Sequence, residues 1–143
     1  MGGVHLRNTR IIVADENPPF LQKAISSLAG EFEVVAIAMT GKLAMDLIRR
    51  YKPDVVVLKL GMPALTGIEL VRELAACPPN PAVVICSGET DPVFVEAAQQ
   101  AGARAYVFGG RIEKDLILAV KSVVQGKPFV SQAVTPKLPG NSL

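Results

Sequence analysis

The residues of this chain that could do chemistry are few, and each follows a short apolar run. Asp15 and Glu16 are adjacent acids after the run 10–14, and Lys59 and Ser87 follow two later runs. Carboxylates can bind a divalent cation, a lysine can neutralise carboxylates, and a hydroxyl can hydrogen bond to an anion. Apolar runs between turn residues are typical of buried parallel strands, whose carboxyl ends form ligand sites. The sequence therefore predicts that these side chains meet at one sheet edge.

Other chemistry-bearing residues are sparse. The single histidine, His5, lies in a polar N-terminal stretch where catalysis is not expected, and Cys77 and Cys86 have no metal-binding or redox spacing. We expect both cysteines to act as small apolar residues in a reducing compartment. Neither GxxxxGK[ST] nor GxGxxG occurs, so no phosphate-binding loop is predicted.

Composition narrows the class of protein. The chain has 143 residues, half of them hydrophobic, which predicts one domain with its own core. Its net charge of +2 comes from interspersed acids and bases, so neither nucleic acid nor a membrane surface is an expected partner. No apolar run reaches the roughly 18 residues of a membrane span, and no signal-peptide core is present. We expect a cytoplasmic protein.

Five strands are expected to alternate with five helices. This pattern predicts a doubly wound parallel sheet in one domain, 10–126, with 1–9 as a tail and 127–143 as a tail or linker. In the second helix we expect Leu43, Leu47 and Ile48 to point inward. The expected strands are 10–14, 32–39, 54–58, 82–86 and 105–108, and the expected helices are 18 to about 29, 42–51, 67–76, 92–101 and 113–125.

Several segments together resemble one family, the receiver domain of bacterial two-component response regulators. The resemblance spans residues 10 to about 125 and implies the flavodoxin-like (βα)5 receiver fold. Residues 126–131 resemble the stretch that joins a receiver to a helix-turn-helix domain in one class of transcription regulators. The matching features are Asp15-Glu16, Lys59-Leu-Gly-Met-Pro-Ala-Leu-Thr-Gly67, Ser87, and Ala101-Gly-Ala-Arg-Ala-Tyr106.

The resemblance also implies roles, and two positions depart from them. The family's phosphate-accepting aspartate aligns with Lys59, and its essential lysine after the fifth strand aligns with Gly109. A lysine in the first position removes the carboxylate nucleophile and places an ammonium where the cation would bind. A glycine in the second removes the cation that would hold a phosphoryl group. Phosphorylation and Mg²⁺ binding are therefore both expected to be lost.

Our hypothesis for the pocket is that Lys59 replaces the metal. Asp15 and Glu16 would repel each other, and a lysine close to one or both relieves that repulsion. The alternative is that Lys59 points to water and the acids are solvated or favour the N-terminus of the first helix. Ser87 and Tyr106 align with the family's switch residues, but they also fit an ordinary turn hydroxyl and a half-buried strand aromatic.

Three functions remain open. The first is a degenerate receiver that acts without phosphorylation as a protein-interaction module. The second is the regulatory half of a transcription regulator whose DNA-binding domain is not in this chain. The third, a flavodoxin-like enzyme or nucleotide binder, lacks a phosphate loop and a nucleophile with a base. The resemblance implies a signalling partner or homodimer at one of two surfaces: the helix 92–101, strand 105–108 and helix 113–125, or the first and last helices. The first surface would include Val93, Phe94, Tyr106, Arg111 and Lys114.

Overall fold

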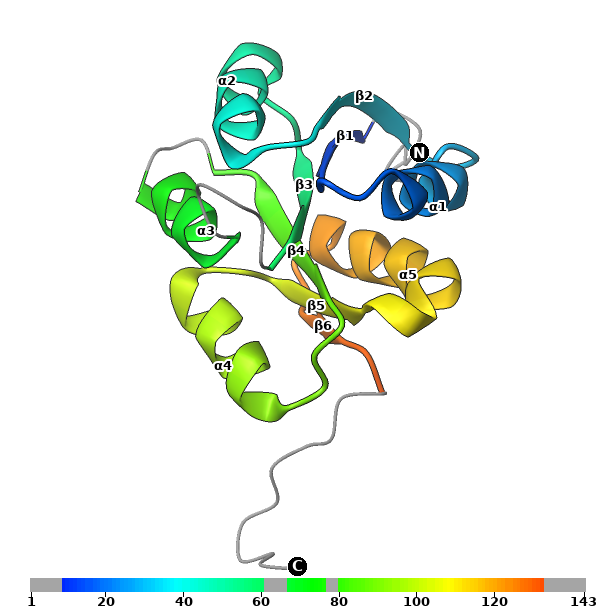
Figure 1. Cartoon of the computed structure of the whole chain (residues 1–143), viewed down its shortest axis with the longest axis vertical. Helices are drawn as coiled ribbons and strands as arrows, with labels where there is room; N and C mark the ends of the chain where they lie inside the picture. Colours follow the sequence, from blue (N-terminus) through cyan, green and yellow to red (C-terminus); the bar gives the residue numbers. More distant parts are fainter. Residues whose placement is uncertain (1–8, 61–66, 77–79, 133–143) are drawn as a thin grey trace, which may run out of the picture.

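A six-stranded parallel sheet forms the centre of the molecule in the computed structural model, which describes residues 9–60, 67–76 and 80–132. The strand order is β2-β1-β3-β4-β5-β6 (Figure 1). The strands are β1 (Arg10–Ala14), β2 (Glu33–Ala38), β3 (Val55–Lys59), β4 (Ala82–Ser87), β5 (Ala105–Phe108) and β6 (Phe129–Val130). The helices are α1 (Pro18–Leu28), α2 (Gly41–Tyr51), α3 (Gly67–Ala76), α4 (Pro92–Ala101) and α5 (Ile112–Val124), and the short 3-10 helix η2 (Gly109–Arg111) precedes α5. The predicted α/β receiver fold is confirmed.

Side-chain caps fix where three helices begin. The side-chain oxygens of Asn17, Thr40 and Asp91 accept hydrogen bonds from backbone N–H groups in the first turns of α1, α2 and α4. Proline follows the cap of α1 and of α4, where its missing N–H costs nothing. Each of these three helices begins a few residues after a strand ends, so the short loop between strand and helix lies at the carboxyl edge of the sheet.

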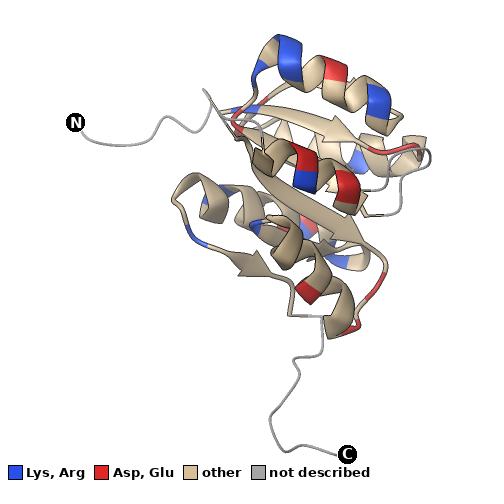
Figure 2. Cartoon of the chain, turned by 90° about the vertical axis from the view of Figure 1, so that its left-hand side faces the viewer, with Lys and Arg blue, Asp and Glu red and all other residues tan. Residues whose placement is uncertain are grey.

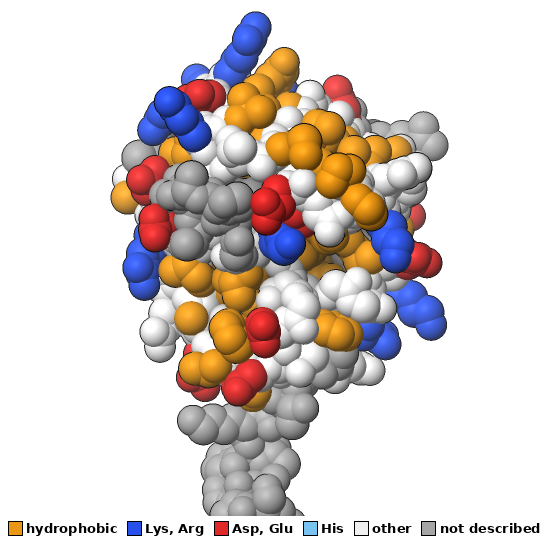
Figure 3. All heavy atoms as spheres, in the orientation of Figure 1, with side chains coloured by type: hydrophobic (Ala, Val, Ile, Leu, Met, Phe, Trp, Pro, Cys, Tyr) orange, Lys and Arg blue, Asp and Glu red, His pale blue; other side chains and the backbone are white. Residues whose placement is uncertain are grey.

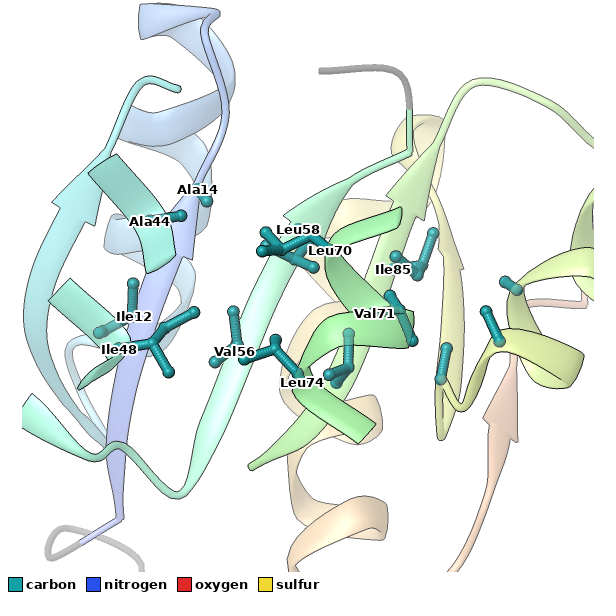
Figure 4. Packing of buried hydrophobic residues seen from close by; sticks show 14 of the residues in the cluster. Ile12, Ala14, Ala44, Ile48, Val56, Leu58, Leu70, Val71, Leu74 and Ile85 are labelled. Carbon is teal, nitrogen blue, oxygen red and sulfur yellow. The ribbon is translucent and has the colours of Figure 1, made fainter. Parts of the chain in front are cut away.

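Two hydrophobic cores cover the two faces of the sheet. Residues of α2, α3 and α4 pack on one face, and residues of α1 and α5 pack on the other. Figure 4 shows the first core: Ile12, Val56 and Ile85 of the strands point toward Ile48 of α2 and Val71 of α3. Because β1, β3 and β4 are buried on both faces, the ends of these strands are held rigidly.

The sixth strand was not predicted. Residues from Lys127 were expected to form a tail or linker, but Phe129 and Val130 of β6 pair in parallel with Ala105 and Tyr106 of β5. The strand is only two residues long and follows a proline, so its local sequence carries little strand signal. Residues 127–132 therefore lie against the domain, while 133–143 are outside the described residues, as is the tail 1–8.

One inward prediction in α2 is wrong. Leu43 is exposed, Leu47 is half-buried, and the core side of the helix carries Ala44, Met45 and Ile48 instead. Ile48 is buried as predicted, and the core side of the helix continues from it to Met45 and Ala44, which lie three and four residues earlier.

Charged side chains of both signs are mixed on the helices. Figure 2 shows basic and acidic residues alternating along α2 and α3. None of the helices in the described part of the chain combines the length and apolar character that a membrane span requires.

Candidate functional site

The carboxyl edge of the sheet carries the residues predicted to lie there. Asp15 follows β1 directly, while Lys59 and Ser87 are the last residues of β3 and β4. The register places Lys59 beside Cys86, and the backbone N–H of Asp15 donates a 2.9 Å hydrogen bond to the carbonyl of Ala38 in β2. Figure 3 shows acidic and basic side chains side by side near the middle of this face.

Lys59 approaches one of the two acids. Its ammonium nitrogen Nζ lies 3.8 Å from Oδ1 of Asp15, which is within ion-pair range but longer than a hydrogen bond. The Asp15 side chain is 2% exposed, whereas that of Lys59 is 37% exposed. The carboxylate is therefore buried, while its cation remains in contact with water.

The environment of Asp15 contains opposing effects. Burial raises the pKa of Asp15 above its ordinary value, while the backbone N–H of Asn17 and the charge of Lys59 act to lower that pKa. The Asn17 N–H donates to Oδ1 of Asp15 at 3.0 Å. Because burial is the largest effect, the contacts that favour the charged carboxylate offset it only in part, and the pKa of Asp15 stays raised.

Glu16 lies outside the pair. Its side chain is exposed, and no ion pair joins it to Lys59 in the described part of the chain. Its negative charge acts to raise the pKa of Asp15 further. Of the two acids that we expected Lys59 to approach, only Asp15 lies within ion-pair distance.

Gly67 allows the chain to return to Lys59. A side chain at Gly67 would place its Cβ 2.5 Å from the carbonyl oxygen of Lys59 and 2.8 Å from that of Leu60, which no residue but glycine tolerates. Its backbone N–H donates to the Leu60 carbonyl at 2.9 Å. The segment 61–66, with Met62 and Pro63 of the sequence motif, is outside the described residues.

Ser87 and Tyr106 both lie buried next to the loop after β4. The Ser87 hydroxyl accepts a 3.0 Å hydrogen bond from the N–H of Glu89, and the Tyr106 hydroxyl donates a 2.8 Å bond to the Glu89 carbonyl. Burial raises the pKa of Tyr106, and a hydrogen bond with Ser87 acts to lower it. Tyr106 is 1% exposed, so its predicted place on a partner surface is wrong.

Comparison with known proteins decides the family. The family model described as "Response regulator receiver domain" matches residues 11–121. The chain belongs to the response regulator receiver domain family. Among curated relatives, the transcriptional regulatory protein DegU of Brevibacillus brevis is 32% identical over 94% of this chain. A probable transcriptional regulatory protein NarL of Mycobacterium tuberculosis is 27% identical over 92%.

The chain spans only 58% of the DegU relative and 62% of the NarL relative. Among solved structures, the isolated receiver domain of RcsB from Salmonella enterica serovar Typhimurium, determined with the phosphomimetic BeF3⁻, aligns with a TM-score of 0.81. It shares 21% identity, and the alignment covers 89% of this chain and 96% of that domain. At this identity the likeness shows the fold alone.

The donor set of this receiver fits a divalent cation poorly. The carboxylate of Asp15 that would bind the ion has the Lys59 ammonium 3.8 Å away, and Glu16 is exposed beside it. Among the described residues, no cluster of three or more His, Cys, Asp and Glu side chains is arranged to bind a metal ion. A second positive charge in contact with Asp15 would be repelled by the ammonium.

Glycine is not required by the backbone at position 109. It begins η2 directly after β5, its φ is not positive, and a Cβ there would lie 3.7 Å from the Ser87 carbonyl, an ordinary van der Waals distance. The structure therefore has room for a side chain at this position.

A buried carboxylate network beside the site was missed by sequence reasoning. Asp115 of α5 accepts hydrogen bonds from Arg111 Nε at 2.9 Å and from the Ser131 hydroxyl at 2.7 Å, and Ser131 Oγ accepts from the Phe108 N–H at 3.0 Å. Burial alone raises the pKa of Asp115, but the bonds from Arg111 and Ser131 outweigh it and leave that pKa below its ordinary value. This network fastens β6 to β5 and α5.

Cys86 is the one predicted cysteine that the structure describes. It is buried in the core, and burial raises the pKa of its thiol far above the usual range. Cys77 and His5 lie outside the described residues.

Proposed function

We propose that this chain is a receiver that works without phosphorylation, as a protein-interaction module in signal transduction. The observation that carries the proposal is the pairing of Lys59 with the buried Asp15. By the resemblance of the sequence, Lys59 aligns with the family's phosphate-accepting aspartate. A lysine at the end of β3 offers no carboxylate nucleophile, and its positive charge beside Asp15 would oppose the binding of a metal ion there. The absence of a lysine at Gly109 supports the same conclusion.

This module would have no catalytic activity of its own and no Mg²⁺ cofactor. The curated relatives that match most of its length are regulatory proteins by name. We propose a cytoplasmic location on the same basis. A protein-glutamate methylesterase of Desulfotalea psychrophila also matches, but the shared region is only 23% of that enzyme.

Either of two surfaces could receive a signalling partner or a second copy. The first includes Val93 and Phe94 of α4 with Arg111 and Lys114 near the start of α5, and Val93 is 56% exposed. The second is the α1–α5 surface, where Lys23 and Glu113 pair at 4.0 Å and Lys121 and Glu31 at 2.8 Å. The exposed apolar Val93 favours the first surface. The centres of protein interfaces are depleted of charged residues, whereas the second surface carries two exposed ion pairs.

A second candidate is the regulatory half of a DNA-binding transcription regulator. The curated relatives named as transcriptional regulators are longer than this chain, which covers 58% and 62% of two of them. The chain described here would then not contact nucleic acid directly. A helix-turn-helix segment encoded downstream in the intact gene would favour this candidate over a stand-alone module.

Magnesium titration by calorimetry tests the proposal. We expect no binding heat at millimolar Mg²⁺ for the natural chain, whereas Lys59→Asp, which restores a third carboxylate, should bind Mg²⁺ with a measurable stabilisation against heat. A lysine elsewhere on the surface, Lys42→Asp, is the matched control and should leave the natural behaviour unchanged. Clear binding by the natural chain would argue against the proposal.

A further inference from the structure

A cavity opens at the amino edge of the sheet, at the opposite end of the strands from Lys59. Its volume is about 570 Å³, within the range of roughly 300–1,000 Å³ that is typical of small-molecule pockets. The first residues of β3 and β4 and the residues just before β1 and β5 line it, together with the last turns of α3 and α5. We call it the amino-edge cavity. Its lining includes neither Asp15 nor Lys59, so it is separate from the candidate site.

Four valines give the amino-edge cavity an apolar part. Val55 and Val123 belong to the core that α1 and α5 cover, whereas Val71 and Val83 belong to the core on the other face of the sheet. All four side chains are buried. The cavity therefore reaches the ends of both cores, and an apolar group placed against these valines would be removed from water.

One acid and one base at the cavity lack a charged partner. Asp54, just before β3, and Arg104, just before β5, are both exposed, and the ion pairs found in the described part of the chain include neither. The Oδ2 atom of Asp54 accepts a 2.9 Å hydrogen bond from the backbone N–H of Arg10, which leaves Oδ1 available. The cavity therefore offers a ligand one charge of each sign.

The Thr9 hydroxyl is a second, independent sign of a ligand. Thr9 is only 6% exposed, yet its hydroxyl takes part in none of the side-chain hydrogen bonds found among the described residues. Every fully buried side-chain nitrogen and oxygen in that part of the chain has a partner, so this hydroxyl keeps some contact with solvent, and Thr9 lines the cavity. A largely buried hydroxyl that the fold leaves without a partner can be satisfied by a polar atom of a ligand.

The strand order sets the length of ligand that fits both charges. β4 lies between β3 and β5, and neighbouring strands are about 4.8 Å apart, so the backbones at Asp54 and Arg104 are about 10 Å apart. With both side chains extended away from the sheet, a charged hydrogen bond of about 2.8 Å at each end leaves about 4–5 Å between the two charged groups of a ligand. A dipeptide matches this span, because its two Cα atoms are about 3.8 Å apart and its ammonium and carboxylate groups lie beyond them.

We propose that the amino-edge cavity binds a short zwitterionic peptide of dipeptide length. The ammonium group of the ligand contacts Asp54, its carboxylate contacts Arg104, and an apolar side chain packs on the valines. Because α3 and α5 both end at the cavity, the negative ends of their dipoles also favour the ammonium group. The inference does not rest on the lack of phosphorylation, since the two sites lie at opposite edges of the sheet.

An NMR titration of the natural chain with alanyl-leucine tests the site. We expect saturable changes in the amide signals of Val55, Val83 and Arg104 with a Kd of about 1 mM or below, and no change at Lys59. Alanyl-leucinamide lacks the carboxylate, N-acetyl-alanyl-leucine lacks the ammonium, and free leucine is too short, so each should bind about tenfold more weakly or worse. No saturable change up to about 10 mM alanyl-leucine, or equal affinity for all four compounds, would overturn the inference and leave the proposed function intact.

A charge-removing variant tests which residue contacts which end of the ligand. Arg104→Gln should weaken the binding of alanyl-leucine about tenfold but leave that of alanyl-leucinamide unchanged, because the amide has no carboxylate for Arg104 to contact. Arg49→Gln is the matched control, because Arg49 is an exposed arginine of α2 outside the cavity lining, and it should change neither affinity. Thermal melting should confirm that both variants fold. Unchanged binding of alanyl-leucine by Arg104→Gln, or an equal loss in Arg49→Gln, would contradict the proposed contact.

Discussion

At the residue scale, the candidate site contains an ion pair whose two members differ in burial. Asp15 is buried, and Lys59, its partner at 3.8 Å, remains partly in water. The carboxylate pays the larger desolvation cost, which is why its pKa is raised even with a cation beside it. The lysine thus offsets part of the cost of burying the Asp15 carboxylate.

Replacing Lys59 with Ala should lower stability at neutral pH. The loss in the free energy of unfolding should lie between the values for breaking an exposed and a buried ion pair. We expect a loss of about 1 kcal/mol, which lowers the melting temperature by about 3 °C. Lys42→Ala is the control, because Lys42 is exposed and forms none of the ion pairs found among the described residues. Equal melting temperatures for Lys59→Ala and the natural chain at pH 7 would contradict the pairing.

The same variant should show a defined pH dependence. Since the folded pKa of Asp15 is raised, ionised Asp15 disfavours the fold, and its contribution improves as pH falls through that pKa toward the unfolded value. Loss of Lys59 raises the folded pKa further. We therefore expect the stability gap between Lys59→Ala and the natural chain to close in acid, as followed by thermal melts between pH 7 and pH 4.

At the element scale, the hydroxyl of Ser131 links the end of β6 to β5 and α5. Ser131 donates to Asp115 and accepts from the Phe108 N–H, while its own N–H donates to the Tyr106 carbonyl at 3.0 Å. Tyr106 in turn binds the Glu89 carbonyl through its side chain. Tyr106 of β5 therefore contacts both the loop after β4 and Ser131, which follows β6.

Ser131→Ala should release β6 without unfolding the domain. It leaves Asp115 and the Phe108 N–H short of a partner, which costs about 1–2 kcal/mol. Amide hydrogen exchange at residues 108 and 131 should accelerate at least several-fold, while Val57 in the centre of the sheet should not change. Ser26→Ala, an exposed serine on α1, is the control. Unchanged exchange at residue 108 would show that the network does not hold the strand.

Asp115 should contribute stability at neutral pH that disappears in acid. Its folded pKa is lowered, so its contribution is present above the unfolded pKa of about 3.9 and is lost as pH falls through the folded value. Asp115→Asn should therefore destabilise the chain by about 2 kcal/mol at pH 7 and much less near pH 2. A gap of equal size at both pH values would contradict this assignment.

Elements with strong local signals could be predicted, and those set by tertiary contacts could not. The bounds of α3 and β5 were predicted correctly, because an apolar period and flanking turn residues fix them. β6 is held by contacts with β5 and α5, and the Ser131–Asp115 bond joins residues 16 apart. In this network only the spacing of Arg111 and Asp115, four residues apart on a helical turn, carried a readable signal.

At the scale of the whole molecule, a parallel sheet brings distant residues to one edge. Because parallel strand ends share that edge, the location of Asp15, Lys59 and Ser87 at one edge could be predicted from the alternation of strands and helices. Side-chain direction could not: Tyr106 is buried, Leu43 is exposed, and Glu16 is left out of the ion pair. These outcomes depend on packing between elements, which local patterns do not encode.

The measurement that tests the central claim most directly is intact-mass analysis after incubation with Mg²⁺ and acetyl phosphate. Our account predicts no phosphoryl group on the natural chain, and a phosphorylated species for the double variant Lys59→Asp/Gly109→Lys, which restores nucleophile and cation together. A phosphorylated species from the natural chain would contradict the account and would indicate a receiver whose function depends on phosphorylation.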